Sequence, residues 1–561
     1  MSSSEWSTRP GLSWARGGAL APAASEIAGL LEPLLLCGLA LAVRLAWLHA
    51  DLHIDELYHL LAARGWSESG IPRINEGVYD RAFLFTALIG WWQEIFGAGV
   101  LVARLPSVIA GTALVLAVFL WTRRVAGPLA AWVAGLLLAF SPIAVELSQL
   151  TRFYALHALL FWLAAICTWH ALAPAAALGS RLAAIALGLL SALLAAHLQL
   201  LTLIGFAGLG LWLAGLLVPP IWMWLRAQGG IGLLMASAVL AAAILALALA
   251  ATAGLADPIW HQYRWTPLWA QQFQNQVHFY HVRLAEQYPV LWPLTGFAVF
   301  AALSFRPRAA AFCATVFGVA FLSASFAGMK DDRYLVFALP FLFALWGMAL
   351  AAVAAPLTQA LLALIERARS LAAPWLPAGP TGVVALSAAV LFALSAGGAS
   401  SRLAFDLARG ELPEGPGRIT PDWAAARTAL APWLEQADAV ITSDEMAALF
   451  HLNRSDALIS GTRLSEIGDG REFGRDPRTG IAVISSPASL RALIACREDG
   501  LVILSERDLA FDWAVRPETV AALATTATPV PVPGLDELRV FRWRTPTAAL
   551  RPCPVGAAAH G

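Results

Sequence analysis

The chain has 561 residues, of which 59% are hydrophobic and 13% are charged, and its mean hydropathy is +0.67. This composition excludes an ordinary soluble domain and indicates a polytopic membrane protein. The formal net charge is zero and no basic stripe follows the chain, so the sequence predicts no nucleic-acid partner and favours the bilayer and lipid-linked molecules instead.

Apolar segments of spanning length follow one another along most of the chain. Residues 1–26 contain no short apolar core that ends in a small-residue cleavage site, so we expect them to form a cytoplasmic tail. A spanning helix needs about 20 apolar residues. This criterion predicts a mainly α transmembrane domain over residues 27–398 with about eleven spans, at 27–49, 104–122, 128–147, 154–172, 182–198, 200–218, 231–252, 290–305, 309–327, 334–354 and 380–398.

Arginines in alternate loops predict the orientation of these helices, because positive residues are retained on the cytoplasmic side. The loops assigned to that side carry Arg123 and Arg124, Arg181, Arg226, Arg306 and Arg308, and Arg367 and Arg369. With an odd number of spans, the C-terminus lies on the opposite, extracytoplasmic side. The ionisable residues of the remaining loops then converge on one outer face.

The first external loop, predicted over residues 49–102, is unusually polar for this chain. It contains Asp55, Glu56, Tyr58, His59 and Arg81. Within it, residues 83–97 are apolar and aromatic but too short to span, so we expect an interfacial helix in the outer leaflet. If that segment did span the membrane, every later loop would change sides, and the arginine distribution argues against this.

The composition changes after residue 398, since 38 of the 74 charged residues lie in the last 164 positions. Short apolar runs at 437–442, 481–484 and 501–504 predict a soluble α/β domain over residues 399–561 on the extracytoplasmic side. Apolar and charged residues alternate over much of 538–543, which predicts an edge strand. The domain has no glycine-rich phosphate loop, so we expect no nucleotide site. It contains Cys496 and Cys553, for which a disulfide is chemically permitted and left open.

Several residues on the predicted outer face suit chemistry on a phosphate-linked substrate. Asp55 can take a proton from an acceptor hydroxyl, although a solvated helix end explains it equally well. Arg152 can grip a phosphate with its planar fork or simply extend to lipid headgroups. Lys330 is the only lysine beside 36 arginines, so either chance or a phosphate contact retained it, with Arg333 nearby. His197 is more simply a polar residue at a helix end.

Short motifs, taken together, resemble the C-type (GT-C) glycosyltransferases. They are Asp55-Glu56 after the first span, Arg-Leu-Pro-Ser at 104–107, Ser141-Pro142, Ser-Gln-x-x-Arg-x-Tyr at 148–154, and Arg333-Tyr334 leading to Pro340. The resemblance covers about residues 27–400. It is strongest towards the protein O-mannosyltransferases and aminoarabinose transferases, which use polyprenyl-phosphate sugars. It implies an inverting transfer on the extracytoplasmic face.

The resemblance also implies roles for individual residues. The base would be Asp55, and Glu56 would position it or assist. The donor phosphate would be bound by Arg152, Tyr154, Lys330 and Arg333. Further candidates for substrate binding are Tyr58, His59, Arg81 and His197. No metal-ligand set is implied, and a divalent ion is left open. The stretch Tyr79–Phe83 replaces the His-Pro-Pro of the protein mannosyltransferases, which favours a membrane lipid or glycan acceptor over a protein.

The sequence therefore predicts a hexosyl- or pentosyltransferase of a bacterial inner membrane, with its active site and C-terminal domain in the periplasm. Heavy use of Ala, Leu and Arg indicates a GC-rich genome and hence an undecaprenyl-type carrier. Two other classes stay open. An envelope assembly protein can have this topology without chemistry. A secondary transporter should place its polar residues near the bilayer midplane in two related halves, and neither feature is evident.

Overall fold

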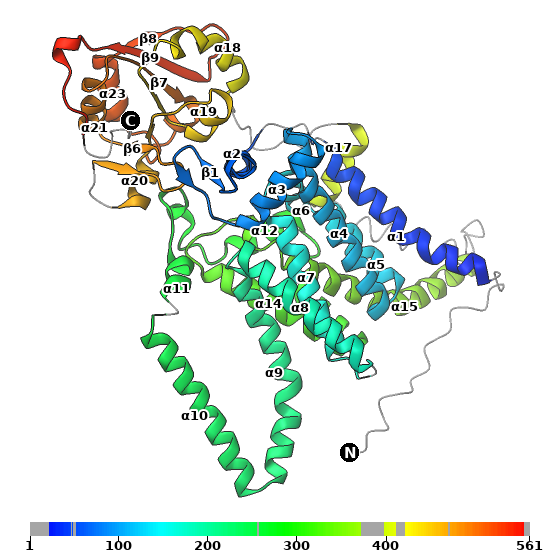
Figure 1. Cartoon of the computed structure of the whole chain (residues 1–561). Coiled ribbons are helices and arrows are strands. Elements are labelled where there is room, and N and C mark those ends of the chain that lie inside the picture. Colours follow the sequence, from blue (N-terminus) through cyan, green and yellow to red (C-terminus); the bar gives the residue numbers. More distant parts are fainter. Residues whose placement is uncertain are drawn as a thin grey trace.

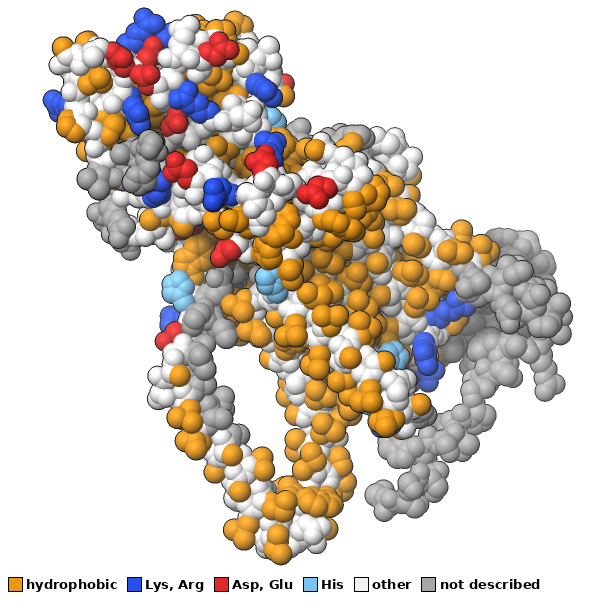
Figure 2. All heavy atoms as spheres, in the orientation of Figure 1, with side chains coloured by type: hydrophobic (Ala, Val, Ile, Leu, Met, Phe, Trp, Pro, Cys, Tyr) orange, Lys and Arg blue, Asp and Glu red, His pale blue; other side chains and the backbone are white. Residues whose placement is uncertain are grey.

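The computed structural model describes residues 22–46, 48, 52–174, 176–254, 257–371, 398–410, 421–468 and 472–554. It has a large helical domain with an α/β domain at one end (Figure 1). Charged side chains gather over the α/β domain and the adjoining end of the helical domain, whereas the rest of the helical surface in this view is mostly hydrophobic (Figure 2). The molecule thus has one polar end.

Long helices make up most of the helical domain. They are α1 (Pro22–Leu45), α4 (Val100–Ala126), α5 (Pro128–Ala139), α6 (Pro142–Gln149), α7 (Tyr154–Ala171), α8 (Leu178–Leu198), α9 (Thr202–Ala227), α10 (Gly230–Thr252), α13 (Thr295–Phe305), α14 (Pro307–Phe326) and α15 (Leu339–Leu371). Buried aromatic rings pack among them, for example Trp121 with Trp162 at a centroid distance of 5.5 Å and Phe312 with Phe341 at 5.5 Å. Such rings bury much apolar area and fix helix spacing.

Five of the described helices, α4, α7, α8, α9 and α14, are long and apolar enough to cross a membrane, and the bent pair α5 and α6 makes up to six. The predicted count of eleven is therefore not confirmed. The segment expected as one span at 128–147 forms this bent pair, in which the helix breaks before Pro142 and bends by 55°. Proline disfavours helical backbone at the preceding residue, and Ser141 is accordingly extended. The expected span at 290–305 contains only an 11-residue helix, and nearly all of 380–398 lies outside the described residues.

Shorter elements form the polar end of the helical domain. They are α2 (Ile54–Ser69), β1 (Arg73–Ile74), β2 (Gly77–Val78), α3 (Phe83–Phe96), α11 (Asp257–Arg264), η1 (Leu268–Phe273), α12 (Phe279–Gln287), η2 (Asp332–Tyr334) and α17 (Ala399–Arg409). Helix α3 is the short apolar helix expected within 83–97, and its interfacial position stays a prediction. On α17, Leu403 packs against Val43 and Val145 of the helical domain.

The α/β domain is built on a seven-stranded sheet with the order β5-β6-β4-β3-β7-β9-β8. Its strands are β3 (Ala439–Thr442), β4 (Ala457–Ile459), β5 (Phe473–Arg475), β6 (Ala482–Ile484), β7 (Asp499–Ser505), β8 (Thr528–Val530) and β9 (Leu538–Arg544). The four central strands β6, β4, β3 and β7 are parallel, and β5, β8 and β9 pair antiparallel with their neighbours. The α/β class is thus as predicted.

The prediction of an edge strand at 538–543 is wrong, because β9 lies between β7 and β8. The edge is the three-residue strand β8, which contains Pro529, a residue without the N–H group that an interior strand would use. Since β8 is shorter than the seven-residue β9, part of β9 has a partner on one side only. This explains why its sequence resembles an edge strand.

Helices surround the sheet and are mostly capped by their own sequence. They are α18 (Trp423–Leu434), α19 (Glu445–His451), α20 (Gly461–Ile467), α21 (Pro487–Ala495), α22 (Glu506–Leu509), α23 (Pro517–Thr526) and the 3₁₀ turn η3 (Thr547–Ala549). For example, Ser486 and Ser489 form a reciprocal cap at the start of α21. A disulfide joins Cys496, at the end of α21, to Cys553.

The β1–β2 hairpin of the first external loop joins the two domains. Glu76 pairs with Arg475 at 2.6 Å, and the Val78 N–H donates to the carbonyl of Pro477 at 3.2 Å. Gly77 is needed here, since a Cβ atom at this position would lie 2.4 Å from the carbonyl carbon of Arg478. The α/β domain therefore rests directly on the loop that carries Asp55.

Candidate active site

Helix α2 fixes Asp55 at the border between the two domains. His53 caps the helix: its Nδ1 accepts from the Asp55 N–H at 3.1 Å, and its own N–H donates to Glu56 at 3.0 Å. This reciprocal cap satisfies two N–H groups that a helix start otherwise leaves unpaired. Asp55 is thereby held in the first turn of α2.

Two arginines from distant loops converge on the Asp55 carboxylate. Arg333 Nη1 lies 2.5 Å from Oδ2, and Arg152 Nη2 lies 3.6 Å from the same atom. Arg152 is 2% exposed and also donates to the Asp55 carbonyl at 3.0 Å. Its guanidinium lies 5.6 Å from the ring centre of Tyr154. The centre is thus a carboxylate between two guanidinium groups.

The charge state of Asp55 is fixed by this arrangement. Burial alone would raise the pKa of the Asp55 carboxyl, but Arg152 and Arg333 outweigh it and hold that pKa well below its ordinary value. Asp55 is therefore ionised at neutral pH while both arginines stay beside it. Any anion that engages the arginines would weaken this effect and raise the pKa again.

Two adjoining cavities meet at Asp55. The first has a volume of about 430 Å³ and lies between α2, α6, η2 and the α/β domain. The second has a volume of about 260 Å³ and extends along the helical domain, past Gln199, Trp265 and Tyr334. Both are lined by Asp55, Arg152, Tyr154 and Arg333, together with Tyr58, Trp269 and Arg463. The charged centre therefore faces a space large enough for a substrate.

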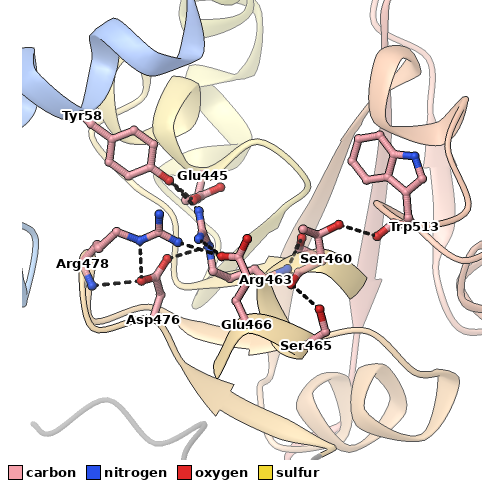
Figure 3. Close-up of polar contacts among 10 residues, drawn as sticks. Tyr58, Glu445, Ser460, Arg463, Ser465, Glu466, Asp476, Arg478 and Trp513 are labelled. Atoms are coloured by element: carbon pink, nitrogen blue, oxygen red, sulfur yellow. Dashed lines mark hydrogen bonds and ion pairs between the residues drawn. The ribbon is translucent and has the colours of Figure 1, made fainter. Parts of the chain in front are cut away.

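Figure 3 shows how the α/β domain contacts α2 beside this space. Tyr58 lies one turn after Asp55, accepts a hydrogen bond from Arg463 at 2.8 Å and donates to Glu445 at 3.4 Å. Arg463 in turn pairs with Asp476 at 2.9 Å. Burial raises the pKa of Glu445 to about 7, against the lowering effect of Arg463. One wall of the first cavity is thus supplied by the α/β domain.

No protein-family model and no curated protein matches the chain. Solved structures do. ArnT from Cupriavidus metallidurans in the apo state is similar over 94% of this chain and 100% of its own, with a TM-score of 0.54 and 17% identity. The same ArnT bound to undecaprenyl phosphate matches with a TM-score of 0.52 over 95% of this chain and 100% of its own, again at 17% identity.

A third similar structure is the oligosaccharyltransferase AglB from Archaeoglobus fulgidus, in complex with an inhibitory peptide and a dolichol-phosphate. It matches with a TM-score of 0.54 and 13% identity, over 90% of this chain and 73% of its own. The chain has the GT-C fold.

Within the GT-C fold, the predicted site residues divide into two groups. The first lines one or both cavities and comprises Asp55, Tyr58, Arg81, Arg152, Tyr154 and Arg333. The second lines neither of them and comprises Glu56, His59, His197 and Lys330. Among the described residues, no group of three or more His, Cys, Asp or Glu side chains is placed to hold a metal ion.

Glu56 lines neither cavity, so of its two expected roles, positioning and assisting, the structure favours positioning. Its two oxygens accept from Arg104 Nη2 at 2.7 Å and Nε at 2.8 Å, and its Oε2 also accepts from the Thr151 N–H at 2.8 Å. Both side chains are almost fully buried. Its partners Arg104 and Thr151 hold the Glu56 carboxylate inside the helical domain, whereas Asp55 lines both cavities.

Lys330 lines neither cavity. Its Nζ donates to the carbonyls of Gln274 at 3.1 Å and Ala327 at 2.5 Å, and the side chain is 2% exposed. It ties together two segments of the polar end. These contacts occupy the ammonium group, and a contact with a donor phosphate stays a prediction.

The two predicted histidines contact other parts of the first external loop. His59 is buried and hydrogen-bonded through Nδ1 to Thr86 at 2.9 Å. His197 accepts from the Leu84 N–H at 3.3 Å, at the start of α3. His59 thus joins α2 to α3, and His197 joins α8 to α3. Sequence reasoning missed Glu445 and Arg463 as cavity residues, since no motif in the α/β domain singles them out.

Proposed function

We propose that the protein is an inverting glycosyltransferase that moves a sugar from a polyprenyl-phosphate carrier to an acceptor hydroxyl or phosphate. The acceptor would be a membrane lipid or envelope glycan, and the reaction would take place at the periplasmic face of a bacterial inner membrane. The observation that carries the proposal is the Asp55 carboxylate held between Arg152 and Arg333 in a cavity at the polar end of a GT-C fold.

The two arginines suit the phosphate of the donor. Guanidinium groups match phosphate oxygens with paired, charge-assisted hydrogen bonds, and they stay charged when buried. A phosphate bound there would compete with Asp55 for both arginines. The pKa of Asp55 would then rise towards its ordinary value, so donor binding itself would prepare the carboxylate to accept a proton.

The bond changes follow from this placement. The acceptor oxygen forms a bond to the anomeric carbon while Asp55 takes its proton. The bond between that carbon and the phosphate oxygen breaks, and the electron pair leaves with the phosphate, which the arginines stabilise. Attack and departure occur on opposite faces of the sugar ring. The configuration at the anomeric carbon is therefore inverted.

Two further observations support the proposal. ArnT has been solved with undecaprenyl phosphate and AglB with a dolichol-phosphate, so proteins of this fold bind polyprenyl phosphates. The Cys496–Cys553 disulfide fits an oxidising compartment, which favours a periplasmic α/β domain. Because both cavities adjoin that domain, the chemistry would occur on the same side of the membrane.

The test is mass spectrometry of the lipids that co-purify with the wild-type protein and with two arginine variants. Arg333→Ala should lose a polyprenyl phosphate that the wild type retains. Arg283→Ala is the control, because Arg283 is half-exposed on α12 and lines neither cavity. If added undecaprenyl phosphate bound wild type and Arg333→Ala equally well, the donor site would be wrongly placed.

A further inference from the structure

The two cavities that meet at Asp55 differ in charge. Among the described residues that line only the second cavity, two are arginines, Arg81 and Arg478, and none is a carboxylate. Those that line only the first cavity include four carboxylates and one arginine: Glu146, Asp331, Glu445, Asp508 and Arg507. The centre with Asp55, Arg152 and Arg333 lies between a positive half and a negative half.

The single arginine of the negative half is already paired. Arg507 Nη2 lies 3.0 Å from Asp444 and 3.1 Å from Asp508. Asp508 also accepts from the Ser443 hydroxyl at 2.8 Å. Burial, opposed by Arg507 and reinforced by Asp444, raises the pKa of Asp508 to about 6. The other arginines that line the first cavity, Arg152, Arg333 and Arg463, also line the second one, and they pair with Asp55 or Asp476. An anion placed away from them, in this half, would meet mainly carboxylates.

The remaining groups of this half suit a neutral, hydroxyl-rich molecule. Ser460 and Thr462 add hydroxyl groups to the wall, and the Thr462 hydroxyl donates to the carbonyl of Trp513 at 3.1 Å. Trp513 is 37% exposed and stacks on Phe511 with a centroid distance of 4.9 Å. Sugar hydroxyls donate to carboxylates, and the C–H face of a sugar ring packs against an aromatic face. Apolar walls with a few placed polar groups are typical of small-molecule sites.

We propose that the first cavity is the acceptor subsite and that the acceptor is a neutral saccharide, attacked through a hydroxyl group rather than through a phosphate. This inference rests on the proposed function for the identity of the reaction. It assigns the donor phosphate to the positive side of Asp55 and the acceptor sugar to the wall formed by Glu445, Asp508 and Trp513. A phosphate on the acceptor would add a negative charge beside these carboxylates, which disfavours its binding at this wall.

The test measures binding by isothermal titration calorimetry to the full chain in lipid nanodiscs, which avoids sugar-based detergents. The probes are methyl β-cellobioside, methyl β-lactoside and methyl α-mannobioside, each with and without a 6′-phosphate. At least one neutral disaccharide should bind, and its phosphate should bind at least ~10-fold more weakly, because one unpaired contact between like charges costs about this much. Equal or tighter binding of the phosphate, or binding of no probe, would overturn the proposal.

Variants locate the binding site. Trp513→Ala should lower the affinity for the neutral probe by at least ~10-fold, since an aromatic side chain that anchors a ligand typically contributes this much. Trp91→Ala is the matched control, because Trp91 is 56% exposed on α3 and lines neither cavity. The double variant Glu445→Gln/Asp508→Asn should bind the phosphorylated probe more nearly as tightly as the neutral one, so the ratio of their dissociation constants should fall. An unchanged ratio, or unchanged binding in Trp513→Ala, would contradict the assignment.

A parallel titration with undecaprenyl phosphate separates this inference from the proposed function. Saccharide binding without any binding of undecaprenyl phosphate would remove the donor assignment and leave the saccharide site standing. If undecaprenyl phosphate bound but neutral saccharides bound no better than their phosphates, the proposed transferase function would stand. The proposal of a neutral saccharide acceptor would be wrong.

Discussion

Arg333 Nη1 lies 2.5 Å from the Asp55 carboxylate, although 278 residues separate the two in the chain. The pair joins the start of α2 to the loop before α15, so it forms only when the helical domain is assembled. It also offsets one of the two positive charges of the centre. In the proposed reaction, a donor phosphate would displace the carboxylate from its arginines, and this exchange would couple donor binding to the activation of Asp55.

Replacing Asp55 tests that coupling directly. Asp55→Asn should lower sugar transfer by about 10²–10⁴-fold, the usual contribution of a general base. Affinity for undecaprenyl phosphate should be retained or increased, because the amide no longer competes for Arg152 and Arg333. The measurements are release of polyprenyl phosphate from the sugar-loaded carrier and calorimetric binding of the free carrier.

Glu76→Gln is the control for Asp55→Asn. Glu76 is a carboxylate of the same external loop, pairs with Arg475 at 2.6 Å and lines neither cavity. Transfer by this variant should match the wild type. Turnover of Asp55→Asn at the wild-type rate would show that another group takes the proton.

Glu445 should make the stability of the protein depend on pH. Its pKa is raised from 4.5 to about 7 by burial in the folded protein. Between these values the folded state binds the proton and the unfolded state does not, so the free energy of unfolding falls as the pH rises from about 4.5 to about 7. The contribution of this residue is about 3 kcal/mol, present below pH 4.5 and lost above pH 7.

Thermal midpoints of the full chain at pH 5 and pH 8 measure this effect. The wild type should have the lower midpoint at pH 8. Glu445→Gln keeps a neutral acceptor for Tyr58 and should reduce the difference between the two pH values. A smaller dependence should remain, because the pKa of Asp508 is also raised, to about 6. Identical pH dependence in both proteins would contradict the raised pKa of Glu445 in the folded protein.

The pair of Glu56 and Arg104 should matter for folding. Both side chains are buried, at 0% and 2% exposure. Glu56→Gln leaves the charge of Arg104 without its partner, and breaking a buried pair in this way costs about 3–5 kcal/mol. The yield of folded protein and its thermal midpoint should both fall. Adding Arg104→Met removes the stranded charge and should restore part of the loss.

The outcome separates positioning from catalysis. If Glu56→Gln folded with the wild-type midpoint and lost only transfer, the direct catalytic role expected from the sequence would be correct after all. If folded yield and transfer fell together and both recovered with Arg104→Met, Glu56 would act by holding α2 against α4.

The sequence was informative about the centre because membrane topology limits where charged residues can lie. Asp55, Arg152 and Arg333 fall in loops predicted on one side, and the structure brings these three side chains together. The same reasoning could not separate Asp55 from Glu56, since both look equivalent until the helix start at His53 fixes which of them faces the cavity. The Ser141-Pro142 pair was noted only as a motif, and the helix break at this proline was not predicted.

The α/β domain was predictable as a fold and not as part of the site. Apolar β-branched runs identify strands from local sequence alone. The position of Glu445 and Arg463 beside Tyr58 depends instead on how two separately folded layers meet, 387 and 405 residues along the chain from that tyrosine. No periodicity or motif encodes such a contact, and a single sequence therefore could not assign these residues to the cavity.

Lys330 and Arg333 lie close in the chain and should respond differently to substitution. Arg333→Gln should weaken the binding of undecaprenyl phosphate by roughly 10–100-fold, the range expected for losing a charged hydrogen bond of about 1.5–3 kcal/mol. Lys330→Gln should leave this affinity within about threefold, since hydrogen bonds to charged groups contribute only where they form and Lys330 donates to the carbonyls of Gln274 and Ala327.

Lys330→Gln should instead lower the thermal midpoint, because the buried contacts between the two segments are lost. Lys330→Arg is the matched control for charge: it keeps the cation but not the compact ammonium group that fits between the two carbonyls. If Lys330→Gln lost binding of undecaprenyl phosphate as severely as Arg333→Gln while keeping the wild-type midpoint, the lysine would contact the phosphate. The single lysine among 36 arginines would then be explained by binding of the donor phosphate, and not by its hydrogen bonds to the carbonyls of Gln274 and Ala327.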